Sequence, residues 1–330
     1  MNQNKENRYD GCWEPRFSCP IPTAIFIPKA RFLYVSSTDG GIDDDTIEIY
    51  NITNPTAPVR VGEFTSVTNL GPAGLAITGT TLYVANLGDG IEIYDITNPT
   101  APVRVGEFGT EDLNVPDQLV ITGNILYVSN DDPTNVNSNN IEIYNITNPI
   151  APVRVGEFGT GELNGPSGMA ITDTTLYVAN SGDNTVVIYN IVNPTAPVRV
   201  GEFGTEDLNS PFGVATTGTT LYVANVGDST VAIYNITNTT APVHVGEFNA
   251  GNLDEPAVLA ITGITLYVAN NANDTVEIYD IINPTAPVRV GEFGAGDLDF
   301  PNGLAVSTLL GDSIEMHVIS CHRLYSISTF

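Results

Sequence analysis

The side chains of this chain with the most chemical potential are aspartates and glutamates in two kinds of polar loop, one after the motif VGEF and one after YVAN. Neither kind of loop contains lysine or arginine, so the mutual repulsion of the carboxylates favours bound cations. Calcium is the natural candidate, because it accepts carboxylate, amide and carbonyl oxygens in loose geometry, and magnesium is second. The nineteen carboxylates are Glu111, Asp112, Glu162, Glu206, Asp207, Asp254, Glu255, Asp297 and Asp299 after VGEF, and Asp39, Asp43, Asp44, Asp45, Asp89, Asp131, Asp132, Asp183, Asp228 and Asp274 after YVAN.

Two of these loops are longer than their counterparts, and a specific site is expected where a repeat is broken. The first spans residues 38–45 and the second spans residues 130–140. They supply the candidate metal ligands, which are Asp39, Asp43, Asp44, Asp45, Asp131 and Asp132. No EF-hand pattern is present, and two other interpretations stay open: a solvated acidic rim, and surface insertions of the kind that loops tolerate.

Other catalytic side chains are scarce. The chain has three histidines, His244, His317 and His322, and no two of them have the spacing of metal ligands. No nucleophile elbow, phosphate-binding glycine loop or haem-attachment motif occurs. The sequence therefore favours a non-enzymatic binding or scaffold protein, with no catalytic residue and with Ca²⁺ as the one candidate cofactor. The alternative is a calcium-dependent hydrolase of the lactonase type.

The net charge of −27, from 38 acidic and 11 basic residues, argues against polyanionic partners. Nucleic-acid affinity depends on lysines and arginines that displace counterions from phosphates, and five of the nine arginines here recur at one repeat position instead of forming a patch. A protein or a surface polymer is the expected partner. The N-terminal residues lack the apolar stretch of a secretory signal, and no segment is apolar over the length of a membrane span.

These loops must be positioned by a repeat that runs almost from end to end. The motif TLYVAN recurs around Tyr83, Tyr127, Tyr177, Tyr222 and Tyr267, with a diverged copy at Tyr34. Each copy is followed by an alternating stretch such as IEIY, a turn TNPTAP, a stretch VRVGEF, a polar loop, and a stretch LAIT. The four apolar stretches predict the four antiparallel strands of a propeller blade, named a (LAIT), b (TLYVAN), c (IEIY) and d (VRVGEF) from the axis outward.

The sequence predicts an all-β fold, a single seven-bladed β-propeller over residues 1–330. The expected blades span about 22–64, 72–108, 116–158, 166–203, 211–248, 256–293 and 301–330, after an N-terminal tail at 1–7. The seventh blade lacks a strand d, and residues 8–17, with Phe17 as the counterpart of the strand-d phenylalanine, are expected to enter it as the outer strand and close the ring. Such a blade places the d-to-a and b-to-c loops on one face, around the mouth of the central channel.

The same closure would bring two cysteines together. Counting the register from the complete units sets Cys321 opposite Ser18 or Cys19, so a disulfide between Cys19 and Cys321 is a candidate. The alternative is that Cys321 is a small buried residue in a reduced protein.

Residues that every blade shares are expected to serve the scaffold. The glutamates of VGEF are interpreted as partners of the arginines on the same strand, as in Glu157 with Arg154. Glycosylation sequons occur at Asn51, Asn145, Asn235, Asn238 and Asn273, and the first three share a turn position at which a capping side chain is the better explanation.

Two portions of the repeat resemble known propeller families. YVANSGDNTVVIYNI, at residues 177–191, resembles the YVTN repeat, and IEIYDITNPTAPVRVGEF, at residues 91–108, resembles the LVIVD repeat of bacterial and archaeal surface proteins. The resemblance implies a propeller at a cell or spore surface and no shared catalytic signature.

Overall fold

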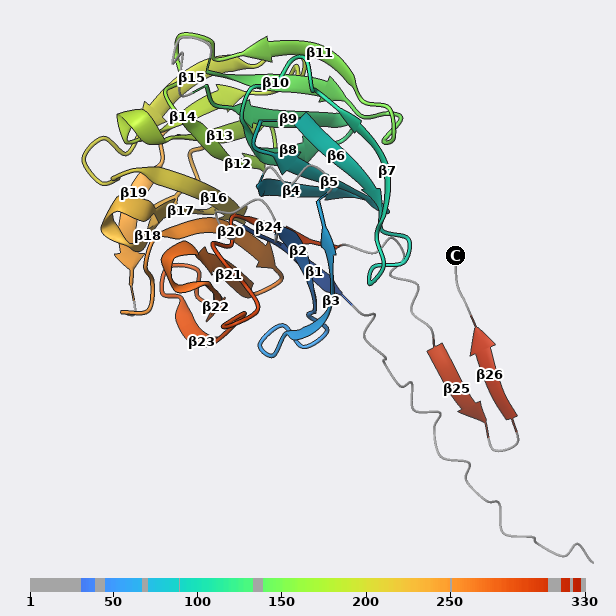
Figure 1. Cartoon of the computed structure of the whole chain (residues 1–330). Helices are drawn as coiled ribbons and strands as arrows, with labels where there is room; N and C mark the ends of the chain where they lie inside the picture. Colours follow the sequence, from blue (N-terminus) through green and yellow to red (C-terminus); the bar gives the residue numbers. More distant parts are fainter. Residues whose placement is uncertain are drawn as a thin grey trace, which may run out of the picture. The chain divides into compact units, whose positions relative to one another are not determined.

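The computed structural model describes residues 31–38, 45–66, 71–88, 90–132, 139–249 and 251–307, together with the backbone of two C-terminal strands. Contacts divide the chain into two compact units, Ala30–Leu310 and a second unit of Met1–Lys29 with Gly311–Phe330. The first unit holds six four-stranded antiparallel sheets, which are the blades of a propeller (Figure 1). In the second unit, β25 (Met316–Ser320) and β26 (Arg323–Ile327) pair with each other.

The inner strands, a, open at a proline in five of the six blades. They are β24 (Gly303–Val306), β4 (Pro72–Thr78), β8 (Pro116–Thr122), β12 (Pro166–Thr172), β16 (Pro211–Thr217) and β20 (Pro256–Thr262) for blades one to six. The b strands are buried throughout and are β1 (Phe32–Ser37), β5 (Thr81–Asn86), β9 (Ile125–Asn130), β13 (Thr175–Asn180), β17 (Thr220–Asn225) and β21 (Thr265–Asn270).

The c strands direct side chains toward the neighbouring blades on both faces, as Ile49 packs with Leu82 of blade two and Tyr50 with Ile278 of blade six. They are β2 (Thr46–Asn51), β6 (Gly90–Asp95), β10 (Asn140–Asn145), β14 (Thr185–Asn190), β18 (Thr230–Asn235) and β22 (Thr275–Asp280). The outer strands, d, are β3 (Val59–Thr65), β7 (Val103–Phe108), β11 (Val153–Phe158), β15 (Val198–Phe203), β19 (Val243–Phe248) and β23 (Val288–Phe293). Short 3₁₀ turns, η2 (Ser181–Asp183), η3 (Val226–Asp228) and η4 (Asn271–Asn273), join b to c in blades four to six.

The prediction of seven blades is wrong, because the propeller has six. The stretch Gly303–Val306, expected to open a seventh blade, pairs instead with β1 as the inner strand of blade one, with Leu33 opposite Val306 and Val35 opposite Leu304. Among the described residues, the ring is therefore closed by one C-terminal strand, β24. The residues expected as that closing strand, 8–17, lie outside the described residues, as do Cys19 and Cys321.

The core consists of apolar layers between neighbouring blades, and one of them joins blade six to blade one. That layer packs Tyr267 and Ile278 against Leu33, Tyr50 and Leu304. Each b-strand tyrosine also donates its hydroxyl to a carbonyl in the c-to-d turn of the next blade. The bonds are Tyr34 to Pro99 (2.9 Å), Tyr83 to Pro149 (2.8 Å), Tyr127 to Pro194 (2.7 Å), Tyr177 to Thr239 (2.9 Å), Tyr222 to Pro284 (2.6 Å) and Tyr267 to Pro55 (2.9 Å).

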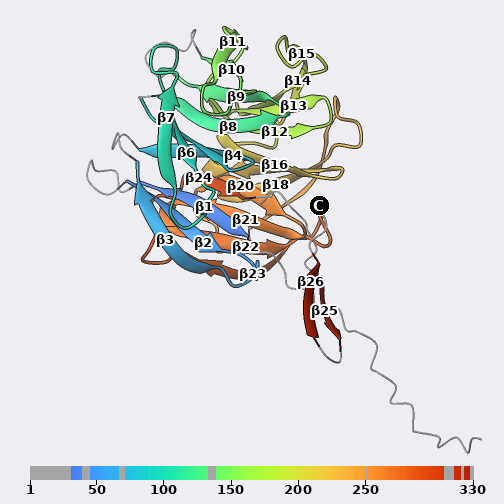
Figure 2. The ribbon, with the colours of Figure 1, turned by 90° about the vertical axis from the view of Figure 1, so that its right-hand side faces the viewer.

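Viewed from a second direction, a strands such as β4, β20 and β24 lie nearer the centre than d strands such as β3, β7 and β23 (Figure 2). The hydrogen bond from Tyr267 to Pro55 spans the two ends of the repeat, so the ring of six is complete without a further sheet. The fold thereby fixes which loops share a face.

Candidate ligand site at the axial ends of the inner strands

The d-to-a and b-to-c loops lie on one face of the propeller, as the sequence predicts, because they are hydrogen-bonded to each other. Backbone amides of the b-to-c loops donate to carbonyls of the d-to-a loops, as from Asp131 to Val115 (3.1 Å) and from Ser181 to Gly165 (3.0 Å). We call this side, with the described d-to-a and b-to-c loops, the acidic face. Fifteen of the nineteen loop carboxylates fall among its described residues, and no described residue of these loops is Lys, Arg or His.

The d-to-a loops hold their acidic tips outward by a repeated device. In blade two, the amides of Asp112 and Leu113 both donate to the carbonyl of Gly109, which closes a tight turn, and the Leu113 side chain is buried beneath it. Gly109 has φ +81°, and a Cβ there would lie 2.5 Å from Leu113 Cδ1, so only glycine fits. The same turn recurs at Gly159, Gly204 and Gly294.

Many of the loop acids accept hydrogen bonds that tie the loops together. Asp183 accepts from the side-chain amides of Asn164 (3.0 Å) and Asn180 (2.9 Å), and Asp228 accepts from Asn209 (3.1 Å) and Asn225 (3.1 Å). These aspartates have a structural role that the count of carboxylates alone does not reveal.

Of the six predicted metal ligands, Asp39, Asp43 and Asp44 lie outside the described residues. Asp45 is buried, and its Oδ2 accepts from the backbone amide of Gly71 in the next blade at 2.7 Å. The residues at the same position in three other blades make the same tie, from Ser210 to Asn184, from Glu255 to Ser229 and from Phe300 to Asp274. A blade-to-blade contact thus accounts for one oxygen of Asp45, while its Oδ1 accepts no hydrogen bond from the part of the chain that the structure describes.

The other two predicted ligands, Asp131 and Asp132, lie in blade three. Burial raises the pKa of Asp131, a hydrogen bond with Asn139 lowers it, and the Asp132 charge raises it. The Asp132 amide donates to Asn139 Oδ1 at 2.7 Å, and its Oδ2 accepts from Asn114 Nδ2 at 3.3 Å. No group of three His, Cys, Asp or Glu side chains among the described residues is arranged to hold a metal ion. The metal site therefore stays a prediction.

Sequence reasoning missed a buried carboxylate beside this loop. In five blades, residues two and three of the inner strand bulge out of the ladder, as the register shift between Pro116 and Leu119 shows. In blade three these residues are Asp117 and Gln118, of which 8% and 7% of the surface is exposed. Desolvation raises the pKa of Asp117 to about 7, and the Asp131 charge adds to the rise, against a lowering hydrogen bond from Gln118.

No other blade carries a charged residue at the position of Asp117. We call the residues at the Asp117 position the axial ring: they are Ala73, Asp117, Ser167, Phe212, Ala257 and Asn302. Gln118, which follows Asp117, joins two members of the ring. Its Nε2 donates to Asp117 Oδ1 at 3.3 Å and to the carbonyl of Asn302, in blade one, at 3.0 Å. Comparing the six copies at this position could have singled out Asp117 from the sequence.

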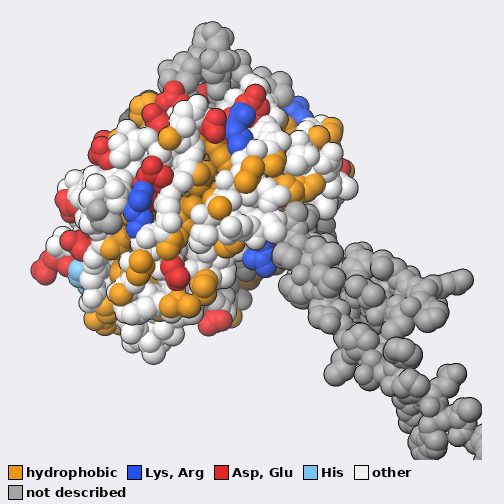
Figure 3. Space-filling model, turned by 90° about the horizontal axis from the view of Figure 1, so that it is seen from below, with side chains coloured by type: hydrophobic (Ala, Val, Ile, Leu, Met, Phe, Trp, Pro, Cys, Tyr) orange, Lys and Arg blue, Asp and Glu red, His pale blue; other side chains and the backbone are white. Residues whose placement is uncertain are grey.

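The scaffold contacts expected on strand d are confirmed, with one addition. Arg154 pairs with Glu157, as predicted, and also with Glu142 on strand c, where Nε and Oε2 lie 2.6 Å apart. The Glu142 side chain is 2% exposed, so the arginine compensates a buried carboxylate. Blades one, two and six repeat this three-residue arrangement through Arg60, Arg104 and Arg289. Charged side chains of opposite sign lie side by side among hydrophobic side chains in Figure 3.

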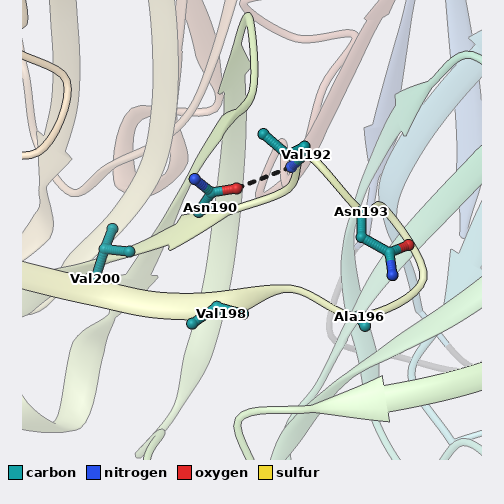
Figure 4. Close-up of a pocket in the computed structure, with 6 residues that line it drawn as sticks. All are labelled: Asn190, Val192, Asn193, Ala196, Val198 and Val200. Carbon is teal, nitrogen blue, oxygen red and sulfur yellow. Dashed lines mark hydrogen bonds between the residues drawn. The ribbon is translucent and has the colours of Figure 1, made fainter.

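A hollow of about 380 Å³ lies at the other end of blade four and belongs to the scaffold. It is lined by Asn190, Val192, Asn193, Ala196, Val198 and Val200 (Figure 4). Asn190 Oδ1 accepts from the amide of Val192 at 2.9 Å, which caps the c-to-d turn. The sequon residues Asn51, Asn145 and Asn235 make the same turn bond, as predicted.

The family comparison supports the repeat assignment. A model described as the LVIVD repeat matches residues 73–110 and 258–294. Both segments are therefore similar to the LVIVD repeat. No curated protein sequence matches the chain. No helix in the described residues is long and apolar enough to cross a membrane.

Solved propellers resemble this chain in fold. A putative 6-phosphogluconolactonase from Bacteroides fragilis is 13% identical, with a TM-score of 0.64 over 84% of this chain and 98% of that one. A periplasmic gluconolactonase from Pseudomonas aeruginosa is 12% identical (TM-score 0.59, 85% and 100% covered). A chain of a nidogen/laminin complex is 14% identical (TM-score 0.60, 84% and 98% covered). At these identities the likeness shows the fold alone.

Proposed function

We propose that this LVIVD-repeat propeller is a non-enzymatic binding protein that takes a cationic protein or surface polymer on its acidic face. The observation that carries the proposal is the charge of that face. Its described loops hold fifteen carboxylates and no basic residue, and repeated turns keep the tips of the d-to-a loops exposed. A surface of one sign attracts a partner of the other sign and speeds encounter.

The rest of the molecule supports a scaffold role. The arginines of strand d form ion pairs with glutamates of the same blades. The family resemblance favours a cell or spore surface, where a polymer or protein partner would be met. The chain of similar fold in the nidogen/laminin complex is a precedent for protein binding by this fold.

Binding of a labelled oligolysine peptide, followed by fluorescence polarisation, tests the proposal. We expect affinity that falls steeply as ionic strength rises, because exposed charges are screened beyond about 10 Å at 0.1 M salt. A variant with Glu111→Gln, Asp112→Asn, Glu206→Gln and Asp207→Asn should bind more weakly. A variant with Glu63→Gln, Glu107→Gln, Glu157→Gln and Glu292→Gln, on strand d, removes the same number of charges and serves as the matched control. No binding by the wild-type protein at low salt would contradict the proposal.

The second candidate is a calcium-dependent hydrolase of the lactonase type, favoured by the fold likeness to gluconolactonases. It needs a set of oxygen ligands for calcium, and the described residues show no such group of acidic side chains. Hydrolysis of a lactone panel in the presence of calcium, abolished by a chelator, would put this candidate first.

A further inference from the structure

The ring of inner strands is tight at four of its six contacts and open at two. In four blades a glycine stands at the third position of strand a, and a Cβ there would lie on a carbonyl oxygen of the next blade. The approaches are Gly303 to Ala73 (2.0 Å), Gly74 to Asp117 (2.3 Å), Gly168 to Phe212 (2.3 Å) and Gly213 to Ala257 (2.3 Å). Blades three and six carry Gln118 and Val258 instead, so their inner strands must stand further from the next blade.

Asp117 lies next to Gln118 on β8, one of the two inner strands that lack this glycine. Only one of its oxygens, Oδ1, accepts a hydrogen bond from a described residue, and no described Lys, Arg or His forms an ion pair with it. A buried carboxylate without a cation costs stability. The scaffold does not require this cost, because Ala73, Ser167 and Ala257 fill the same position in blades two, four and six.

Gln118 completes an arrangement of acceptors around this carboxylate. Its amide nitrogen is committed to Asp117 Oδ1 and to the Asn302 carbonyl, which holds its side chain across blade two and leaves Oε1 as an acceptor. In addition, the backbone amide of Gln118 donates to Ser129 Oγ at 2.8 Å, which fixes the bulge. Asp117 Oδ2 and Gln118 Oε1 are therefore two acceptors held at the axial end of one inner strand.

We propose that Asp117 and Gln118 bind a single primary ammonium group, such as the side chain of a lysine presented by the partner. The inference rests on the proposed function and names the anchor within the acidic face. One carboxylate matches one positive charge, and an ammonium offers three donors to neighbouring acceptors. A divalent cation would need a fuller oxygen shell than these two side chains provide.

Titration calorimetry with a neutral glycine–serine peptide that contains one lysine tests the anchor. The same peptide with an acetylated lysine is the ligand control, because acetylation removes the charge. We expect Asp117→Asn to weaken binding of the lysine peptide at least about tenfold, and Glu63→Gln, an exposed glutamate of β3 outside the acidic face, to change it less than about twofold. The acetylated peptide should not bind.

A second variant keeps the test independent of how Asp117→Asn folds. Gln118→Gly installs the residue that four other blades carry, so the scaffold accepts it, yet it removes one acceptor and the brace on Asp117. It should also weaken binding. Three results would overturn the anchor. They are equal affinity for both peptides, full affinity for the lysine peptide in Asp117→Asn, and displacement of the peptide by calcium at a site that depends on Asp117.

The outcome for oligolysine separates the two proposals. If oligolysine binds and only the loop variants weaken it, the acidic face is confirmed as the binding surface and the anchor is wrong. If oligolysine does not bind while the single-lysine peptide depends on Asp117, the anchor stands and the proposed function falls.

Discussion

Asp117 lowers the stability of the fold as a buried carboxylate, which its five counterparts in the axial ring do not. Its pKa is raised from 3.8 to about 7, chiefly by burial. The folded protein therefore binds more protons than the unfolded chain between about pH 4 and about pH 7, and its stability should fall as the pH rises through that window. Buried groups with strongly shifted pKa values are concentrated at functional sites, which agrees with the role inferred for this carboxylate.

We predict that Asp117→Asn raises the free energy of unfolding by about 2–4 kcal/mol at about pH 8, because a shift of about three pKa units corresponds to about 4 kcal/mol. At about pH 4 the variant should match the wild type, since the Asp117 side chain is then neutral in the folded state. Urea denaturation at both pH values measures this. Asp112→Asn, on the exposed loop tip, should show no such difference, and a pH-independent effect of Asp117→Asn would contradict the assignment.

At the scale of the strands, the ion pairs between strands c and d differ from blade to blade. In blade three Arg154 contacts both the buried Glu142 and the exposed Glu157. In blade four Val187 replaces the strand-c glutamate, and Arg199 pairs with Glu202 alone, at 2.7 Å. In blade five Ala232 replaces the strand-c glutamate and His244 replaces the strand-d arginine. The arginine matters most where it compensates a buried charge.

Arg154→Ala should therefore lower the free energy of unfolding by about 2–3 kcal/mol, because it leaves a buried carboxylate without its cation. Arg199→Ala, which removes an exposed pair, should cost less than about 1 kcal/mol. Both variants are compared by urea denaturation at neutral pH. Equal losses would indicate that packing of the arginine stem, common to both blades, dominates over charge compensation.

The strands were predictable from the sequence because the repeat displays each of them five or six times. The pairing partner of the last inner strand was not, since the apolar stretch at 303–306 suits either a new blade or blade one, and only the match of Leu33 with Val306 decides. The acidic face followed from strand order. Asp117 was overlooked because it lies within a strand, where a bulge and close packing, invisible in the pattern, bury it at the axis.

At the scale of the whole molecule, stability depends on closure by a single strand. β24 supplies the inner edge of blade one, and Leu304 and Ala305 belong to the apolar layers on its two sides. Without it, β1 would have an open edge and two layers would lose side chains, whereas β25 and β26 belong to a separate compact unit. A six-bladed ring therefore predicts that residues 311–330 can be removed without loss of stability, whereas a seven-bladed ring predicts that they cannot.

Two truncations distinguish these rings. Removal of residues 311–330 should leave the melting temperature of the propeller within a few degrees of the full chain, because no strand of the six blades is lost. Removal of residues 303–330 should lower it sharply and promote aggregation, since the edge of β1 is exposed together with apolar surface. Leu304→Asp in the full chain should act in the same direction, because it places a charge in the layer that joins blades six and one. Calorimetry and light scattering measure both effects, and a large loss on removal of residues 311–330 alone would show that the C-terminal hairpin completes the ring after all.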